Sequence, residues 1–198
     1  MATRILAVLG TYRKGAVLDS IVDEVLAGAR EKGAKTEKIY LLDKHVEFCT
    51  NCRSCTQEPG PERGKCVIED DMESILTQIE AADALVLGSP VNCGNVTAIF
   101  RRFMERLTGY AYWPWTRPAP SRRIKKTTKK AVLVTSSAMP GFFVPLATGA
   151  INALKMTSKA LSVRPAGILC VGLSAQIERA MLSAKTIRRA REMGSRLA

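Results

Sequence analysis

Two groups of residues in this sequence have types and spacings that could do chemistry. The first follows an apolar run at residues 5–9 and reads Gly10-Thr-Tyr-Arg-Lys-Gly15, with a helical pattern directly after it. A strand that enters a helix through a glycine loop leaves backbone N–H groups unpartnered at the positive end of the helix dipole. The hydroxyl of Thr11 and the charges of Arg13 and Lys14 add donors. We predict a phosphate site here, although a plain strand–turn–helix joint with exposed cations fits the same pattern.

The second group is four cysteines in a predicted loop at residues 43–69, the cysteine loop. Cys49, Cys52 and Cys55 have C-x2-C-x2-C spacing, and Cys66 follows them. Thiols in this pattern could hold a [4Fe–4S] cluster. No signal peptide precedes the first apolar run, so we expect a cytoplasmic protein, in which such cysteines indicate metal or redox chemistry before disulfides. The alternative is four reduced thiols that pack the loop.

The rest of the chain alternates between strand-like and helix-like patterns. Strands are expected at residues 4–9, 35–42, 84–88, 131–135 and 166–172, and helices at 17–32, 70–81, 96–107, 146–162 and 175–197. The second helix is expected to begin with Asp70 as its N-cap and Glu73 three residues on.

This alternation predicts a single α/β domain over residues 1–198. Its core would be a doubly wound, five-stranded parallel sheet with helices on both faces. Five units suit the flavodoxin-like strand order 2-1-3-4-5, and ligands bind such sheets at the carboxyl ends of the strands. We therefore expect the loops at residues 10–18, 88–97 and 135–141 to converge, and their polar, glycine-rich composition suits a phosphate and a flat heterocycle.

The composition limits the classes of partner. Lys and Arg number 30 against 18 Asp and Glu, a net charge of +12. Such a surface suits anionic partners, but no motif that reads DNA or RNA accompanies it, so we expect no nucleic-acid partner. Hydrophobic residues make up 46%, and no apolar run approaches the roughly 20 residues of a membrane span. A globular protein without a membrane partner is predicted.

The sequence resembles the NAD(P)H-dependent FMN reductase family, a flavodoxin-like group that includes iron–sulfur flavoproteins. The match runs in register over about residues 4–108 and more loosely over 130–175. The segments that carry it are Gly10-Thr-Tyr-Arg-Lys-Gly15, Cys49-Thr-Asn-Cys52-Arg-Ser-Cys55, Lys65-Cys66-Val-Ile-Glu-Asp70-Asp71-Met72 and Gly88-Ser-Pro90-Val-Asn-Cys-Gly94.

The resemblance implies FMN as the cofactor and NAD(P)H as the co-substrate. The FMN phosphate would lie among Gly10, Thr11, Arg13, Lys14, Gly15, Ala16 and Val17. The isoalloxazine ring would lie against Pro90, Val91, Asn92, Cys93, Gly94, Asn95, Thr135, Ser136 and Ser137. Asn92 stands where an aromatic residue is common in the family, and Trp113 or Trp115 could supply the missing ring contact.

The implied activity is a two-step exchange carried by the flavin, with no catalytic side chain. NAD(P)H would reduce FMN, and a small acceptor such as a quinone, a free flavin, an azo compound or a metal oxyanion would take the electrons. The alternatives are an iron–sulfur flavoprotein or a flavodoxin-type electron-transfer protein. A further alternative is a nucleic-acid-binding or regulatory protein on the same scaffold.

Residues 109–128, the insertion, are too long and too aromatic for a simple connector. Four aromatic residues fall within six positions and are followed by prolines and cations. We predict a lid or subunit contact over the flavin, with an NADPH phosphate attracted by Arg122, Arg123, Lys125 or Lys126. A nucleic-acid surface is the alternative. The insertion and the basic surface also favour a homodimer or homotetramer.

Overall fold

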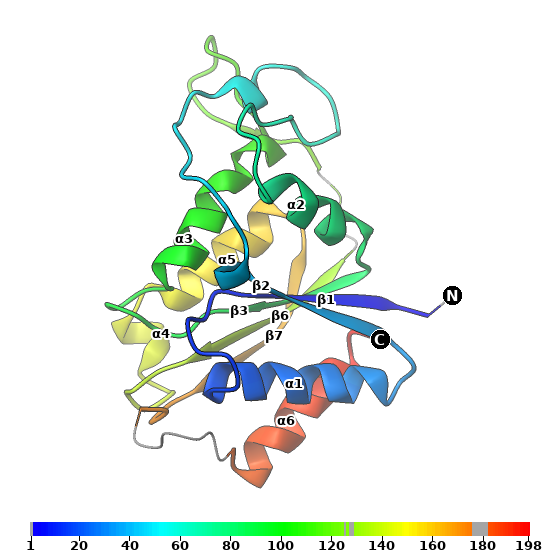
Figure 1. The fold of residues 1–198 in the computed structure, drawn as a ribbon, viewed down its shortest axis with the longest axis vertical. Helices are drawn as coiled ribbons and strands as arrows, with labels where there is room; N and C mark the ends of the chain where they lie inside the picture. The colour runs from blue at the N-terminus through cyan, green and yellow to red at the C-terminus, as the bar shows by residue number, and fades with distance from the viewer. Residues whose placement is uncertain (1, 125, 127–128, 176–181) are drawn as a thin grey trace.

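The computed structural model describes residues 2–124, 126, 129–175 and 182–198. Its centre is a parallel sheet with the strand order β2-β1-β3-β6-β7. This order confirms the predicted flavodoxin-like 2-1-3-4-5 arrangement (Figure 1). The strands are β1 (Arg4–Leu9), β2 (Lys35–Tyr40), β3 (Ala84–Gly88), β6 (Lys130–Ser136) and β7 (Arg164–Val171).

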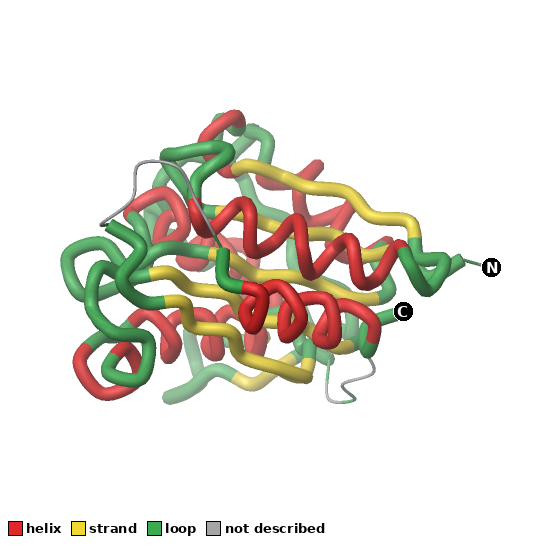
Figure 2. Tube along the Cα trace, turned by 90° about the horizontal axis from the view of Figure 1, so that it is seen from below, coloured by secondary structure: helices red, strands yellow, loops and turns green. Residues whose placement is uncertain are grey.

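Helices cover both faces of the sheet. One face carries α1 (Val17–Arg30) and α6 (Ala184–Ser195), which Figure 2 shows lying across the strands. The other carries α2 (Met72–Ala81), α3 (Ala98–Glu105) and α5 (Ala150–Ala160). Among the described residues, no helix has the length and apolar character that crossing a bilayer requires.

Each strand divides its apolar side chains between two cores. In β1, Ile5, Ala7 and Leu9 pack with α1 and α6, whereas Leu6 and Val8 pack with the opposite helices. Side chains alternate along a strand, so a continuous apolar run fills both cores when both faces of a sheet are covered. The apolar runs of the sequence therefore fix the sheet firmly, and with it the positions where the connecting loops begin.

The second and the last helix start at other residues than predicted. The second helix has Asp71 as its N-cap rather than Asp70, although the Asp70 carboxylate accepts from Met72 N–H at 2.9 Å and also binds Arg106. The last helix begins at Ala184 rather than at residue 175, and residues 176–181 lie outside the described residues.

The helix predicted at 146–162 is two helices, α4 (Val144–Ala147) and α5. Gly149 separates them, and its N–H donates to the carbonyl oxygen of Gly94 at 2.8 Å. A Cβ at Gly149 would lie 2.7 Å from the Asn95 side chain, so the chain bends where another loop approaches it closely.

The insertion and the cysteine loop form a small unit of their own beyond α2 and α3, at the top of Figure 1. The cysteine loop contains the short helix η2 (Ser54–Thr56), and η1 (Leu41–Asp43) precedes it. Helix η3 (Arg106–Tyr110) leads into the antiparallel pair β4 (Ala111–Tyr112) and β5 (Ser121–Arg122). Backbone bonds join the two segments: Trp113 N–H donates to Thr56 O, and Gly64 N–H donates to Gly109 O, both at 2.9 Å.

Candidate functional site

The loops that follow β1, β3 and β6 meet around one cavity at the carboxyl edge of the sheet, the rim cavity. Its volume is about 350 Å³. Its lining comes from four segments: Thr11, Tyr12, Arg13, Ala16, Val17 and Leu18; Pro90, Val91 and Asn92; Ser136, Ser137 and Ala138; and Ser174 and Ala175. The structure therefore brings together the three loops whose convergence the strand order predicts.

Hydrogen bonds connect these loops directly. Thr97, the N-cap of α3, donates its hydroxyl to Gly10 O at 2.6 Å and its N–H to the Ser89 hydroxyl at 3.0 Å. Val91 N–H donates to Ser136 O at 2.8 Å. The three loops are thus held as one rigid frame, and a ligand in the cavity meets backbone that is already ordered.

The two glycines of the first loop have different roles. A Cβ at Gly10 would lie 2.5 Å from the Cβ of Phe100, so Gly10 allows α3 to approach the loop. Gly15 has open space around it but adopts a φ of +73°, a conformation that glycine adopts without strain. Of the two glycines, Gly15 is the one with an unusual backbone conformation near the predicted phosphate site.

A buried carboxylate supports the loop from below. Asp19 accepts hydrogen bonds from Gly15 N–H at 2.7 Å, from Lys38 Nζ at 2.8 Å and from the Tyr40 hydroxyl. Burial alone would raise the pKa of this carboxyl, but the three donors outweigh it and lower the pKa below its ordinary value. The carboxylate therefore stays charged and fixes Gly15 at the start of α1.

The first turn of α1 has the features of a phosphate site. Its N-cap, Ala16, offers no side chain to the first N–H groups of the helix. Thr11, Arg13, Ala16 and Val17 all line the rim cavity beside it. Lys14 was predicted here as well, but its ammonium pairs with Asp43 at 2.6 Å and does not line the cavity.

The second loop turns sharply away from the cavity after Asn92. Asn92 and Asn95 exchange two backbone hydrogen bonds around Cys93 and Gly94, both of which have positive φ. Pro90, Val91 and Asn92 line the cavity, whereas Cys93, Gly94 and Asn95 do not. The Cys93 thiol is exposed at the tip of this turn.

The third loop adds an unpaired polar atom. Ser136 and Ser137 line the cavity, and Thr135 lies just beneath them at the end of β6. The buried Thr135 hydroxyl has no hydrogen-bond partner among the described residues. A phosphorylated planar ring with polar edges fits the open helix N-terminus and the polar groups that line the cavity.

Five lining residues were missed by the sequence interpretation: Tyr12, Leu18, Ala138, Ser174 and Ala175. Ser174 follows β7 and donates both its N–H and its hydroxyl to Ser137 O. The signal was available, because the fifth strand ends at the same edge of the sheet as the others.

The four cysteines of the cysteine loop gather around Cys55. Burial raises the pKa of the Cys55 thiol, and the sulfurs of Cys66, Cys49 and Cys52 raise it further. Across the part of the chain that the structure describes, no three Cys, His, Asp or Glu side chains stand close enough to hold a single metal ion. A [4Fe–4S] cluster spreads its four thiolate ligands around a cube, so the gathering of these sulfurs fits that larger group.

A family model for NADPH-dependent FMN reductases matches residues 3–142. The chain belongs to this FMN reductase family. The match contains all three predicted loops of the rim cavity and the whole cysteine loop. The resemblance inferred from the sequence is therefore confirmed.

Relatives of this FMN reductase family member are named iron–sulfur flavoproteins. One from Archaeoglobus fulgidus is 33% identical over 107 residues, 54% of this chain and 46% of the relative. Another from Methanocaldococcus jannaschii is 36% identical over 103 residues, 52% of this chain and 51% of the relative. The chain spans about half the length of the curated relatives it matches.

Solved structures share the fold of this family member. The NAD(P)H:quinone oxidoreductase from Methanothermobacter marburgensis superposes with a TM-score of 0.72 at 16% identity, with 100% of each chain covered. The FMN-dependent NADH-azoreductase from Bacillus anthracis, solved in complex with FMN, has a TM-score of 0.72 at 16% identity, covering 98% of this chain and 99% of the other. At these identities the likeness shows the fold alone.

The insertion packs on the cysteine loop and does not cover the rim cavity of its own chain, so the predicted lid was wrong, whereas a subunit contact stays a prediction. The guanidinium of Arg53 lies over the rings of Trp113 and Trp115, at 3.9 and 4.2 Å from their centroids. No described residue of the insertion lines the rim cavity. The two tryptophans therefore stack on a cation of the cysteine loop, and the expectation that one of them replaces an aromatic at Asn92 was wrong.

The cations of the insertion are also placed differently from the prediction. Arg123 is buried and donates to five carbonyl oxygens, those of Cys55, Glu58, Gly60, Gly109 and Ala111. It is fully occupied and cannot bind an NADPH phosphate. Lys126 is exposed, and Lys125 lies outside the described residues.

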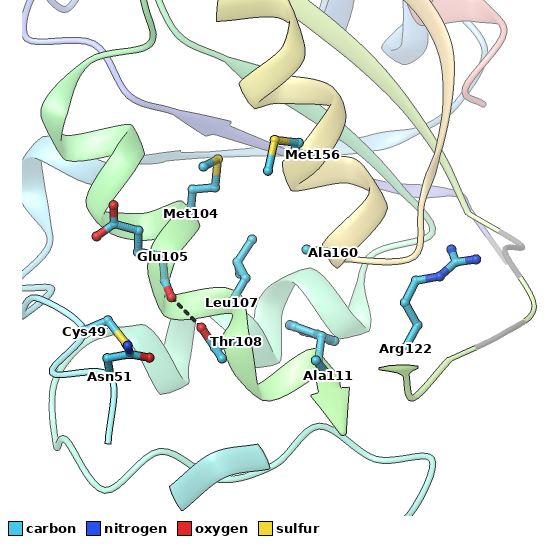
Figure 3. Close-up of a pocket in the computed structure, with 11 residues that line it drawn as sticks. Cys49, Asn51, Met104, Glu105, Leu107, Thr108, Ala111, Arg122, Met156 and Ala160 are labelled. Carbon is cyan, nitrogen blue, oxygen red and sulfur yellow. Dashed lines mark hydrogen bonds between the residues drawn. The ribbon is translucent and has the colours of Figure 1, made fainter. Parts of the chain in front are cut away.

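Arg122 lies at a second, mostly apolar cavity of about 500 Å³ (Figure 3). This cavity lies between the cysteine loop, the end of α3, η3 and α5, and Met104, Leu107 and Met156 provide much of its wall. It shares no lining residue with the rim cavity. These two cavities of the FMN reductase family member are therefore separate, and of the two it is the rim cavity that has the polar frame of a phosphate and ring site.

Proposed function

We propose that this protein is an FMN-dependent oxidoreductase that takes electrons from NAD(P)H and passes them to a small acceptor. The observation that carries the proposal is the rim cavity, where an open helix N-terminus and three cross-bonded loops surround one space. Membership of the NADPH-dependent FMN reductase family supports the same cofactor.

Each part of the frame has a role in this proposal. Thr11, Arg13 and the first N–H groups of α1 would bind the phosphate. Pro90, Val91 and Asn92 on one side, with Ser136 and Ser137 on the other, would hold the ring edges. Bound FMN would accept a hydride and pass its electrons on, so these residues need only bind and orient.

The test compares FMN with riboflavin, which has the same ring and no phosphate. An Arg13→Gln variant should lose roughly tenfold or more in FMN affinity, as expected for one charge-assisted hydrogen bond, and should bind riboflavin as the original protein does. Arg4→Gln is the matched control, because Arg4 is exposed at the opposite end of β1. A purified protein that neither contains nor binds FMN, judged by its visible spectrum, would falsify the proposal.

The same proposal also covers the chemical class of the electron acceptor. Quinones, free flavins, azo compounds and metal oxyanions are the classes we propose, and two solved structures of the same fold are named for quinone and azo compounds. Oxidation of NADH and of NADPH should be followed with a soluble quinone and an azo dye in parallel. If the protein oxidises neither NADH nor NADPH, its function would be restricted to electron transfer.

A second candidate function is that of an iron–sulfur flavoprotein. It is favoured by the gathering of Cys49, Cys52 and Cys66 around Cys55 and by the names of the relatives. When bound to these thiols, a cluster would supply one-electron transfer. Anaerobic purification with iron and sulfide analysis tests it, and iron-free protein after reconstitution would contradict it.

We also propose assembly into a homodimer or homotetramer. Phe142 and Leu146 expose 71% and 84% of their surface beside the rim cavity loops, and Phe143 adds a second exposed ring. Neighbouring exposed apolar side chains of this kind are typical of protein–protein contacts. Light scattering should give a mass above one chain, and Leu146→Glu should lower it.

A further inference from the structure

A buried ion pair lies directly beneath the cysteine loop. Arg106 begins η3, and Asp70 precedes α2; their side chains are 1% and 0% exposed, and Arg106 Nη1 lies 2.5 Å from Asp70 Oδ2. A buried pair of charges loses its hydration, and a protein in which apolar residues replace such a pair is often as stable as the original. Its presence under four cysteines calls for a role beyond stability.

The guanidinium uses its donors unequally. Nη1 binds Asp70 and also Glu47 O at 2.8 Å, and Nη2 binds the other Asp70 oxygen at 3.2 Å. The second hydrogen of Nη2 is directed to the sulfur of Cys66 at 3.6 Å. Nε is buried without a partner among the described residues. Asp70 therefore orients the Arg106 guanidinium, and the Nη2 hydrogen that does not bind Asp70 is donated to the Cys66 sulfur.

An enclosed space of about 20 Å³ lies at the same point. Cys55, Cys66 and Arg106 line it together with Tyr110, and it has room for about one water molecule. The Arg106 donor of the N–H···S contact is buried, and Cys66 is partly buried. A hydrogen bond in such surroundings is electrostatically stronger than one at the surface.

We propose that Arg106, aimed by Asp70, is a positioning residue for the Cys66 sulfur and raises the reduction potential of a [4Fe–4S] cluster held there. This inference rests on the second candidate function above. Adding one electron to a cluster increases the negative charge on its thiolate sulfurs, and an N–H donor to one of them stabilises that reduced state. The same arginine would also orient the Cys66 side chain toward the other three.

The experiment measures the midpoint potential of the cluster by redox titration followed by electron paramagnetic resonance. Removing Arg106 alone would leave Asp70 buried without its counter-charge, so the main variant replaces both, Asp70→Asn with Arg106→Met. Arg106→Lys is the second variant, because it keeps the positive charge but lacks the fork that reaches carboxylate and sulfur together. Arg53→Lys is the matched control: it keeps the positive charge beside Cys52, and Arg53 donates to backbone oxygens and stacks on tryptophans rather than binding a sulfur.

Both variants at Arg106 should shift the midpoint potential downward at unchanged iron, sulfide and FMN content, and Arg53→Lys should leave it in place. A purely structural pair would change stability or loading but not the potential. Unchanged potentials in fully loaded variants would overturn the inference and leave the iron–sulfur function intact. If the double variant takes up no iron, the potential of the Arg106→Lys variant decides.

Original protein that binds FMN but takes up no iron and sulfide would overturn both the inference and the second candidate function. That result would leave the proposal of an FMN-dependent oxidoreductase intact.

Discussion

The rim cavity and the cysteine loop are held in place by different means. The rim loops are short and follow parallel strands, and they are joined mainly by backbone groups and small hydroxyls such as those of Thr97 and Ser89. The cysteine loop is long and is held by arginines. Arg106 and Arg123, from distant segments, bind its carbonyls and one sulfur, and its own Arg53 stacks on the tryptophans of the insertion.

This difference follows from where the backbone can find partners. Parallel strands deliver the rim loops to one edge, where neighbouring N–H and C=O groups already face one another. An irregular loop has no ladder, so its buried carbonyls need donors from side chains. Arginine suits this purpose because it offers five N–H donors in a rigid fork. Changes in the two regions should therefore have separable consequences.

The largest expected effect tests the cysteine loop. Arg123→Met keeps much of the side-chain volume but removes the donor to five carbonyls, so the free energy of unfolding should fall by about 3 kcal/mol. Hydrogen exchange in the cysteine loop and in the insertion should accelerate, while FMN content stays constant. Arg117→Met, at an exposed cation of the same insertion, should change stability by no more than about 0.5 kcal/mol. If Arg123→Met lost FMN but kept the loop protected, the two regions would not be independent.

The next effect tests the rim through close packing. Gly10→Ala places a Cβ against Phe100 and should cost about 2–3 kcal/mol, with weaker FMN binding, because α3 and its N-terminal loop must move. Gly15→Ala meets open space and should cost only about 1 kcal/mol from its positive φ. Denaturant unfolding of both variants measures the difference. Equal losses would mean that Gly10 is not limited by contact with α3.

A somewhat smaller effect is expected at the link between two rim loops. Thr97→Val removes the α3 cap and leaves Gly10 O without its donor, a loss of about 2 kcal/mol. FMN binding should weaken in parallel, whereas hydrogen exchange in the cysteine loop should not change. Thr77→Val, on the exposed side of α2, is the matched control and should be nearly neutral. Intact FMN affinity in Thr97→Val would show that the rim does not need this connection.

The smallest effect concerns acid sensitivity at the rim. The folded pKa of Asp19 lies below its ordinary value of 3.8, so its charge stabilises the fold above that value and the contribution is lost as the pH falls through the folded pKa. Asp19→Asn should lower stability at neutral pH by about 1 kcal/mol, because Lys38 is partly exposed and retains Asp23. The gap between the two proteins should close below about pH 4. A gap that stays constant in acid would assign the effect to packing rather than to charge.

The sequence allowed the rim to be predicted more completely than the cysteine loop. Thr11, Pro90 and Ser136 line the cavity because each stands at or just after the end of a strand with a clear apolar run. The partner of Asp70 could not be predicted in the same way. Asp70 and Arg106 are 36 residues apart, and no local pattern shows that a carboxylate at a helix start also receives a buried arginine.

Lys14 and the insertion show the same limit. Lys14 stands in a loop rich in donors, yet its ammonium forms an ion pair with Asp43, which follows β2. The aromatic and basic content of the insertion fits a lid, a subunit contact or a nucleic-acid surface equally well. Only the position of Arg53 between Trp113 and Trp115 shows that its aromatic content packs on the cysteine loop.

The sequence by itself determined the order of strands and helices, and with it which loops share an edge, because apolar periodicity fixes the faces of regular elements. The tertiary structure decided which side chain within each loop faces the cavity and which carbonyls each arginine binds. Loops have no period, so the direction of their side chains depends on contacts with segments far along the chain.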